Sequence, residues 1–239
     1  MKDWFVKWFD TDYYHILYKD RDYKEAALFI DNITSYLNLP DHAKVLDLCC
    51  GKGRHSSYLN TLGFDVLGVD LSENSIAEAK KNQNDSLHFK IHDMREPLDQ
   101  KFDAVFNLFT SFGYFEDVQD NVTTLKAIQQ SLLDDGFAVI DFMNAHKVIP
   151  NLVTSEEKQV DGIDFHIKRW HEGGYIFKNI KFEDKGQEYD FTERVKALTL
   201  EEFESMMEEA GIYLLDIFGD YRLGKFNKET SDRLIMIFK

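Results

Sequence analysis

The stretch V-L-D-L-C-C-G-K-G-R-H at residues 45–55 decides the fold of this chain. Its first half is an apolar run typical of a buried strand, and its second half is a glycine-bearing turn that leads into a helix-like segment. Gly51 and Gly53 let the backbone adopt conformations that a side chain would forbid, and they let a ligand approach the main chain closely. The stretch therefore predicts a ligand-binding loop between a strand and a helix.

Short apolar runs alternate with helix-like segments on both sides of this loop. Gly63 is predicted to end the helix that follows the loop, and Ser72 is typical of a helix N-cap. Strands that alternate with helices predict a parallel, doubly wound sheet. The predicted strands cover residues 44–49, 65–70, 87–92, 102–106 and 137–141, and the predicted helices cover residues 54–62, 72–82 and 121–133.

The periodicity changes after residue 150. Strand-like segments are separated there by glycine-bearing turns, which is typical of antiparallel hairpins. Thr199 is predicted to cap an acidic helix that ends at Gly211. The strand-like segments cover residues 164–170, 175–182 and 189–197, and two closing strands cover residues 212–221 and 233–238.

These patterns together predict an α/β fold with a Rossmann-like, doubly wound, mostly parallel seven-stranded sheet. The sheet carries an N-terminal helical extension and an inserted antiparallel β flap. We expect residues 1–43 to form a helical cover, residues 44–149 and 199–239 to form the cofactor-binding domain, and residues 150–198 to form a flap over the substrate site.

Composition limits the class of protein. The 239 residues carry a formal net charge of −15, which opposes nonspecific binding to nucleic-acid phosphates or anionic lipid. Cys49 and Cys50 are the two cysteines, and as adjacent residues they predict neither a disulfide nor a metal site. Acidic residues interrupt the N-terminal segment, and no apolar run approaches the ~18 residues of a membrane span. We expect a cytoplasmic protein without a metal.

The acidic residues around the glycine loop indicate which ligand it binds. Asp70 ends the next strand, 19 residues after Gly51, where a carboxylate can accept hydrogen bonds from both hydroxyls of a ribose. A dinucleotide-binding loop has a third glycine where this chain has Ser56, and Asp47 would repel a pyrophosphate. Asp47 suits an ammonium instead, so the predicted ligand is a nucleoside with an amino-acid moiety, S-adenosylmethionine (SAM).

The chain resembles the class I SAM-dependent methyltransferases of the small bacterial type with the signature L-D-L-C-C-G-x-G-R-H, which it carries at residues 46–55. The departures from the more general pattern are Cys49, where glycine is usual, and Asp134-Asp135-Gly136 in place of P-G-G. The resemblance extends along the chain through G-V-D-L-S at 68–72, D-M-R at 93–95, N-L-F-T-S-F-G-Y-F at 107–115, E-R-V-K-A-L-T-L-E-E-F at 193–203 and S-D-R-L-I at 231–235.

The resemblance implies a set of cofactor contacts. Arg54 is a candidate donor to the cofactor carboxylate. Tyr14 or Tyr18 would close over the cofactor, and an aromatic lid would also attract the sulfonium. The family pattern places Asp47, Gly51 and Gly53 around the methionine part, Asp70 at the ribose, Leu71 on the adenine face, Asp93 at the adenine amino group with Met94 beside it, and Asn107, Leu108 and Phe109 under the cofactor.

Several of these residues also have a purely structural interpretation, which the sequence leaves open. Asp70 is a possible helix cap and Asp93 an ordinary turn residue. Leu71 and Met94 have the character of core residues, and Arg54 that of a solvated helix residue.

The acceptor site is far less defined by the sequence. Methyl transfer from a sulfonium is an in-line displacement that needs a base only where the acceptor must lose a proton, so no nucleophile or triad is expected. The catalytic residue is therefore unassigned, and the candidates at the predicted carboxyl edge of the sheet are Tyr114, Asn144, His146 and Tyr221.

The N-terminal segment is rich in aromatic residues. Trp4 and Trp8, like Phe5 and Phe9, are four residues apart and would form an apolar face on a helix. Such a face would cover the sheet or the flap.

The sequence thus predicts an enzyme that transfers a methyl group from SAM to a small molecule and releases S-adenosylhomocysteine (SAH). Methylation of RNA or protein is an alternative, but the net charge and the lack of a Lys/Arg cluster argue against RNA. A non-catalytic SAM-binding module is another alternative. The acceptor atom, the pathway and the oligomeric state do not follow from the sequence.

Overall fold

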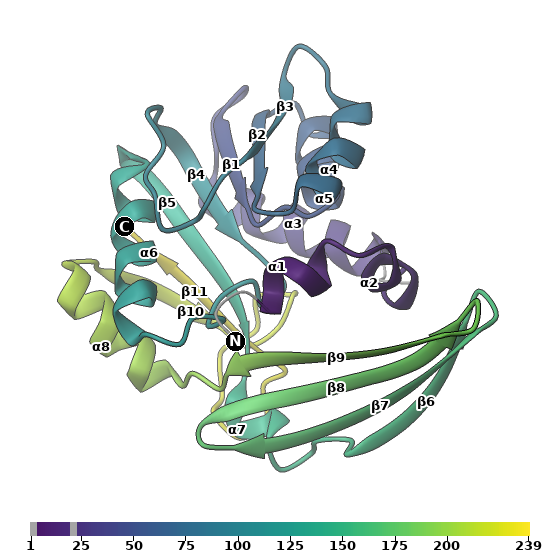
Figure 1. Cartoon of the computed structure of the whole chain (residues 1–239). Helices are drawn as coiled ribbons and strands as arrows, with labels where there is room; N and C mark the ends of the chain where they lie inside the picture. Colours follow the sequence, from purple (N-terminus) through teal and green to yellow (C-terminus); the bar gives the residue numbers. More distant parts are fainter. Residues whose placement is uncertain (1–3, 20–22) are drawn as a thin grey trace.

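The computed structural model describes residues 4–19 and 23–239, with the side chains of residues 7–19 and 24–239 (Figure 1). Trp4 and Phe5, two members of the predicted aromatic face, therefore have side chains outside the described part. Within the described part no helix is long and apolar enough to cross a membrane.

A seven-stranded sheet forms the centre of the molecule. Its strand order is β10-β11-β5-β4-β1-β2-β3, and every strand is parallel to its neighbour except β11, which is antiparallel to both β5 and β10. This confirms the predicted doubly wound architecture. The strands are β1 (Lys44–Leu48), β2 (Asp65–Asp70), β3 (Leu87–Ile91), β4 (Phe102–Asn107), β5 (Leu132–Met143), β10 (Leu214–Phe218) and β11 (Arg233–Phe238).

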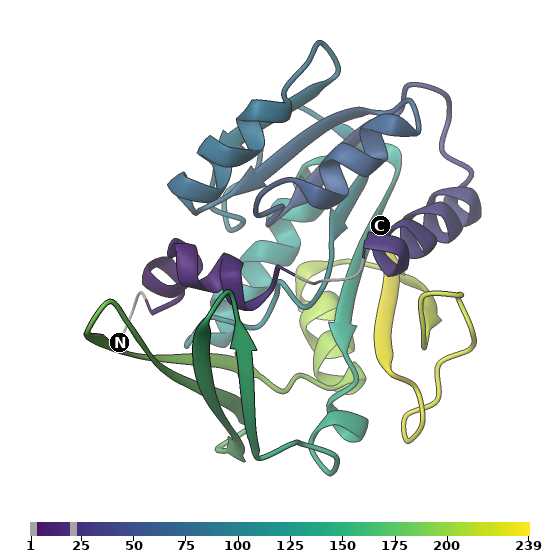
Figure 2. The same ribbon diagram turned by 90° about the vertical axis from the view of Figure 1, so that its right-hand side faces the viewer.

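Helices cover both faces of this sheet because its central strands are apolar on both sides. Val45 of β1 faces a core shared with α3, α4 and α5, whereas Leu46 faces a core shared with α6 and α8. Figure 2, turned by 90°, shows the same layers from the side. The helices are α3 (Tyr23–Leu37), α4 (Arg54–Thr61), α5 (Glu73–Ala79) with the 3-10 turn η1 (Lys80–Asn82), α6 (Val118–Gln130), α7 (Ala145–Val148) and α8 (Leu200–Ala210).

Local signals set the helix ends as expected. The Ser72 side chain accepts a hydrogen bond from the main chain of Ser75 at the start of α5. Thr199 and Glu202 form a reciprocal capping box at the start of α8, and Gly211 ends that helix in the left-handed conformation.

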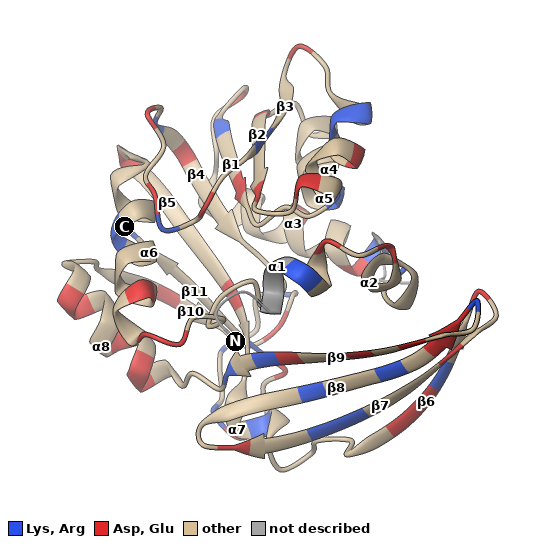
Figure 3. Ribbon diagram, in the orientation of Figure 1, with Lys and Arg blue, Asp and Glu red and all other residues tan. Residues whose placement is uncertain are grey.

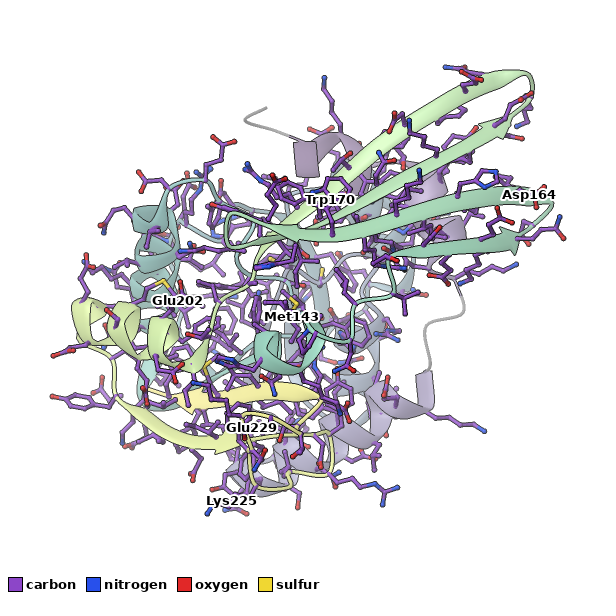
Figure 4. The ribbon with its side chains drawn as sticks, turned by 90° about the horizontal axis from the view of Figure 1, so that it is seen from below. Met143, Asp164, Trp170, Glu202, Lys225 and Glu229 are labelled. Atoms are coloured by element: carbon purple, nitrogen blue, oxygen red, sulfur yellow. The ribbon has the colours of Figure 1, made fainter. Side chains whose placement is uncertain are left out.

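The predicted flap is a separate four-stranded antiparallel sheet in the order β6-β7-β8-β9. Two-residue turns join its strands, and both residues of each turn have positive φ, as in Asp161-Gly162. Figure 4 shows Asp164 at the far end of this sheet and Trp170 at the end nearest the body. The strands are β6 (Ser155–Val160), β7 (Ile163–Glu172), β8 (Tyr175–Asp184) and β9 (Gln187–Lys196).

The N-terminal helices α1 (Trp4–Phe9) and α2 (Asp12–Leu17) pack on this second sheet. Trp8 and Leu17 share an apolar cluster with Phe165 and Ile180 of the flap, while α3 packs on the seven-stranded sheet. Figure 1 shows α1 and α2 between the two sheets. The predicted helical cover is thus divided between two different surfaces.

Candidate active site

A cavity of about 450 Å³ lies between the carboxyl ends of the central strands and helices α1 and α2. This is where a parallel α/β sheet opens into a crevice, and its volume lies in the range of about 300–1,000 Å³ usual for small-molecule sites. Eleven of the candidate cofactor-binding and catalytic residues line it: Tyr14, Tyr18, Gly51, Arg54, Asp70, Leu71, Asp93, Met94, Leu108, Phe109 and Tyr114.

The two loop glycines serve different purposes. Gly51 lines the cavity with φ of +55°, and an added Cβ there would meet no atom within 4 Å, so the main chain is open to a ligand. Gly53 begins α4 with φ of +76°, and an added Cβ would lie 2.5 Å from the Phe89 ring. Gly51 thus keeps the cavity accessible, whereas Gly53 permits close packing of the loop on β3.

Asp70 connects the loop to the end of β2. Its Oδ2 accepts a hydrogen bond of 2.8 Å from the main-chain N–H of Gly51, and its Oδ1 accepts one of 2.9 Å from Ser72. Burial raises the pKa of Asp70, although these main-chain donors oppose the rise. A carboxylate has about four acceptor positions, so Asp70 retains capacity for a ligand at the cavity wall.

Asp47 lies beneath the loop and does not line the cavity. Ser56 Oγ donates a 2.6 Å hydrogen bond to its Oδ2, and burial raises the pKa of Asp47 to about 6. Ser56 stands where a dinucleotide loop has its third glycine, and its side chain makes this bond to Asp47. Ser56 Oγ occupies the space beside Gly68, where an added Cβ would lie 2.7 Å from it.

Two apolar side chains, Leu71 and Met94, belong to the cavity lining together with Asp70. Leu71 is 39% exposed at the cavity wall, and Met94 lines the same cavity with its sulfur 3.5 Å from that of Cys49. Asp93 is fixed by Arg95, whose Nε and Nη2 donate hydrogen bonds of 3.0 and 2.6 Å. Burial opposes ionisation of Asp93, but the bonds from Arg95 prevail and lower its pKa.

Aromatic side chains surround the remaining part of the cavity. The Phe9 ring lies 4.9 Å from that of Tyr14 and 5.5 Å from that of Tyr114, and the Tyr14 and Tyr18 rings are 4.9 Å apart. The Tyr114 hydroxyl donates a 2.7 Å hydrogen bond to the carbonyl of Thr110. This fixes the ring of Tyr114 on the loop that follows β4.

Phe109 forms the wall nearest the glycine loop. The Arg54 guanidinium lies 5.3 Å from its ring centroid, and Arg54 Nη2 lies 3.0 Å from His55 Nε2. Arg54 and His55 both line the cavity, so the start of α4 carries donors next to an aromatic face.

Three of the four catalytic candidates lie outside the cavity. Asn144 is buried, and its Nδ2 donates to the carbonyls of Lys228 and Ser231 at 2.9 and 2.8 Å. Tyr221 donates a 3.1 Å hydrogen bond to Asp141, and His146 is exposed on α7. Their positions give no support to a role as general base, and only Tyr114 of the four lines the cavity.

Asn107 also has a supporting position. It is buried at the end of β4, where its Nδ2 donates to the carbonyls of Leu48 and Ser111 at 3.1 and 3.3 Å. It joins the first strand to the loop after β4 without lining the cavity.

Among the described residues that line the cavity, none belongs to β6–β9. The flap instead contacts the N-terminal helices, which carry Phe9 and Tyr14 of the cavity lining. Glu193 of β9 accepts hydrogen bonds from Trp8 Nε1 at 2.6 Å and from the Tyr18 hydroxyl at 2.9 Å. The Tyr18 hydroxyl also contacts Lys178 of β8.

Sequence reasoning missed several lining residues. His92 lies at the carboxyl end of β3 beside Asp93, so the rule that ligands bind at strand ends was sufficient to find it. The others depend on how α1, α2 and the loops pack, which no local pattern records. The lining residues outside the eleven candidates are Phe9, His15, Lys19, Cys49, Cys50, Lys52, His55, Ser75, His92, Ser111 and Phe115.

Comparison with known proteins identifies the family of this chain. A family model described as a methyltransferase domain matches residues 39–211, which is more than half of the chain. The chain belongs to the methyltransferase-domain family. It is a SAM-dependent methyltransferase with the class I fold, as the resemblance implied.

Individual relatives are similar over large parts of this methyltransferase. The putative methyltransferase YqeM of Bacillus subtilis (strain 168) is 28% identical over 77% of this chain and 79% of its own length. A dTDP-3-amino-3,4,6-trideoxy-alpha-D-glucopyranose N,N-dimethyltransferase of Streptomyces venezuelae is 30% identical over 55% of this chain and 56% of its own length. A SAM-dependent methyltransferase structure from Clostridium acetobutylicum ATCC 824 has a TM-score of 0.81 at 23% identity, covering 95% of each chain.

The cavity of this methyltransferase suits SAM on three observations. The Gly51 main chain is open, Asp70 retains acceptor positions, and Leu71 and Met94 add apolar side chains to the lining. No group of three or more His, Cys, Asp or Glu side chains in the described part of the chain is arranged to hold a metal ion.

Proposed function

We propose that this methyltransferase transfers the methyl group of SAM to the nitrogen of a small-molecule amine. The amine would lie between the loop after β4 and helices α1 and α2. The observation that carries the proposal is the aromatic lining of this space by Phe9, Tyr14, Tyr18 and Tyr114. Aromatic faces attract cations, and both the sulfonium donor and a methylated ammonium product are cations.

The cofactor contacts belong to the same proposal. Asp70 would accept hydrogen bonds from the ribose, and the adenine would lie between Leu71 and Met94 with its amino group near Asp93. The open main chain at Gly51 and the guanidinium of Arg54 would hold the methionine part. Gly53 and Asp47 would support the loop from below.

Methyl transfer from SAM requires mainly that the protein position the two reactants. When bound, SAM supplies an activated methyl group, so the chain's task is to align the acceptor with it and to exclude water. Phe109 and Tyr114 would shape the acceptor side, and α1 and α2 would cover it. A neutral amine attacks through its own lone pair, so this proposal requires no nucleophilic side chain.

The size of the site and one relative support a small acceptor. The cavity of about 450 Å³ must hold the cofactor as well, which leaves room for a compact molecule. The name of the Streptomyces venezuelae relative describes an N,N-dimethyltransferase of an amino sugar nucleotide. Figure 3 shows blue and red positions interleaved along β6–β9, an arrangement that does not favour a nucleic acid.

The test is SAH release from SAM with a panel of small amines, matched to alcohols and thiols of the same skeleton. Turnover with amines alone supports the proposal, and turnover with only oxygen or sulfur acceptors, or only with RNA or peptides, refutes it. Tyr14→Leu and Tyr14→Phe form a matched pair for the aromatic argument. The leucine variant should lose two- to thirty-fold more affinity for SAM than for SAH, which lacks the sulfonium charge, because a cation–π contact contributes about 0.5–2 kcal/mol. The phenylalanine variant should keep the ratio.

A further inference from the structure

The turn after β4 has an unusual backbone. Phe109 and Thr110 have φ of +62° and +61°, so two consecutive side-chain-bearing residues lie in the left-handed region. Residues other than glycine avoid this region, and they remain there only where the surroundings hold them. Phe109 lines the cavity, so the strained turn is part of the site's wall.

One residue binds both main-chain N–H groups of this turn. Asp141, near the end of β5, accepts the N–H of Phe109 on its Oδ2 at 2.9 Å and the N–H of Thr110 on its carbonyl oxygen at 2.9 Å. Asp141 is 0% exposed and does not line the cavity. Its carboxylate therefore acts on the turn and touches no ligand there.

A second residue neutralises the buried carboxylate. Arg233 begins β11, the neighbour of β5 in the sheet, and its Nε donates a 2.7 Å hydrogen bond to Asp141 Oδ1. Its Nη2 donates a 3.0 Å hydrogen bond to Thr110 Oγ1, and its guanidinium lies 5.8 Å from the Phe109 ring centroid. Tyr221 adds a 3.1 Å hydrogen bond to Asp141 Oδ2.

Tyr221 lies on the connection between β10 and β11, where Figure 4 labels Lys225 and Glu229. The buried pair is thus held by β5, β11 and this connection together. A charge pair of this kind is fixed in place because separating it would leave one charge buried without a partner.

We propose that Asp141 and Arg233 are positioning residues that hold Phe109 and Thr110 in the left-handed turn. The turn sets the Phe109 ring against Arg54, and so it fixes the wall between the methionine end of the cofactor and the acceptor. The ligand side of this inference rests on the proposed function, whereas the hydrogen bonds of the turn stand independently of it.

A rescue experiment tests the assignment. Asp141→Asn should weaken SAH binding by about tenfold, because the carboxylate no longer pairs with Arg233 and binds the turn less firmly. Glycine adopts positive φ readily, so adding Thr110→Gly to the Asp141→Asn protein should raise its SAH affinity at least threefold. Thr110→Gly alone should stay within threefold of the wild type. Isothermal titration with SAH gives the affinities, and urea unfolding confirms that each variant is folded.

Two further variants complete the design. Asp103 accepts a main-chain N–H at the opposite end of β4, from Lys44 at 2.8 Å, so Asp103→Asn is a matched control that should leave SAH affinity unchanged. Tyr221→Phe removes one donor to Asp141 and should weaken SAH binding about threefold, which keeps the test valid where Asp141→Asn does not fold.

The outcomes separate the two proposals. If Asp141→Asn and Tyr221→Phe fold and bind SAH like the wild type, the positioning role is wrong. The same holds if Thr110→Gly fails to restore binding, because the loss then reflects damage elsewhere. If the wild type binds no SAH, the proposed function fails first.

Discussion

Replacing Asp70 by asparagine should weaken SAH binding by roughly 30- to 150-fold. The Asp70 carboxylate accepts main-chain N–H groups from Gly51 at 2.8 Å and from Ser72 at 2.9 Å, one on each oxygen. Asparagine has a single acceptor oxygen, so its NH₂ group must face one of these two donors. The variant loses an acceptor for the ribose and also gains a donor–donor contact beneath it. Hydrogen bonds to a charged group contribute about 1.5–3 kcal/mol, and a combined loss of about 2–3 kcal/mol gives the stated range.

Isothermal titration of SAH into the purified variant measures this loss. Asp65→Asn is a matched control, since Asp65 is exposed at the opposite end of β2 and its replacement changes the net charge by the same amount. This control should bind SAH like the wild type. Circular dichroism should show both variants folded at the titration temperature.

The pH dependence follows from the same carboxyl group. Burial raises the pKa of Asp70, so its neutral form is reached at a higher pH than for an ordinary aspartate. The neutral form accepts fewer hydrogen bonds, so SAH affinity should fall as the pH is lowered through that pKa, and the asparagine variant should lack this fall. A folded Asp70→Asn protein that binds SAH within threefold of the wild type would refute the ribose assignment. An equal loss in Asp65→Asn would assign the effect to net charge.

Two other perturbations test separate parts of the site. Burial raises the pKa of Asp47 from 3.8 to about 6, so the folded state binds more protons than the unfolded state. The wild type should therefore lose about 2 kcal/mol of unfolding free energy relative to Asp47→Asn as the pH rises from 4 to 7. Urea unfolding at the two pH values measures the difference, and a constant difference contradicts the assignment. Asp10 joins α1 and α2 to the start of α5 through Ser72 Oγ at 2.6 Å and Asn74 N at 3.0 Å. Asp10→Ala should therefore speed SAH dissociation about tenfold in stopped flow, with Asp12→Ala as the control, and an unchanged rate would mean that these helices do not retain the ligand.

The sequence predicted the seven-stranded sheet well because its strands are buried on both faces. Such strands are near-continuous apolar runs, and β2 and β11 have the predicted bounds at 65–70 and 233–238. Strand β6 was missed because S-E-E-K-Q-V carries a single large apolar residue, as an edge strand often does. The predicted helix at 121–133 extended too far, since Leu132 pairs with Phe102 and begins β5. The apolar side chain of Leu132 is compatible with a helix or a strand, and only its pairing with Phe102 distinguishes the two.

The candidate site was predictable as far as the order of the strands determines it. Asp70 is the last residue of β2, and Asp93 and Phe109 come two residues after β3 and β4, so topology alone gathers them at one edge. Asn144 and Tyr221 lie at the same end of the sheet, but their side chains bind other parts of the protein. Asn144 donates to the carbonyl of Lys228, and Tyr221 donates to Asp141. The direction of a side chain at a strand end depends on the packing of neighbouring segments, which one sequence does not reveal.

The flap contributes no lining residue among those described, but it positions the helices that carry part of the aromatic lining. Its inner face buries Trp8 and Leu17, and Glu193 accepts hydrogen bonds from Trp8 and Tyr18, so α1 and α2 are held on the flap by apolar and polar contacts together. The same helices are joined to the seven-stranded sheet at the start of α5 through Asp10. The aromatic wall of the cavity therefore has its position set from both sheets. We expect changes within the flap to alter acceptor binding through α1 and α2, and changes in Tyr14 or Tyr114 to alter it directly.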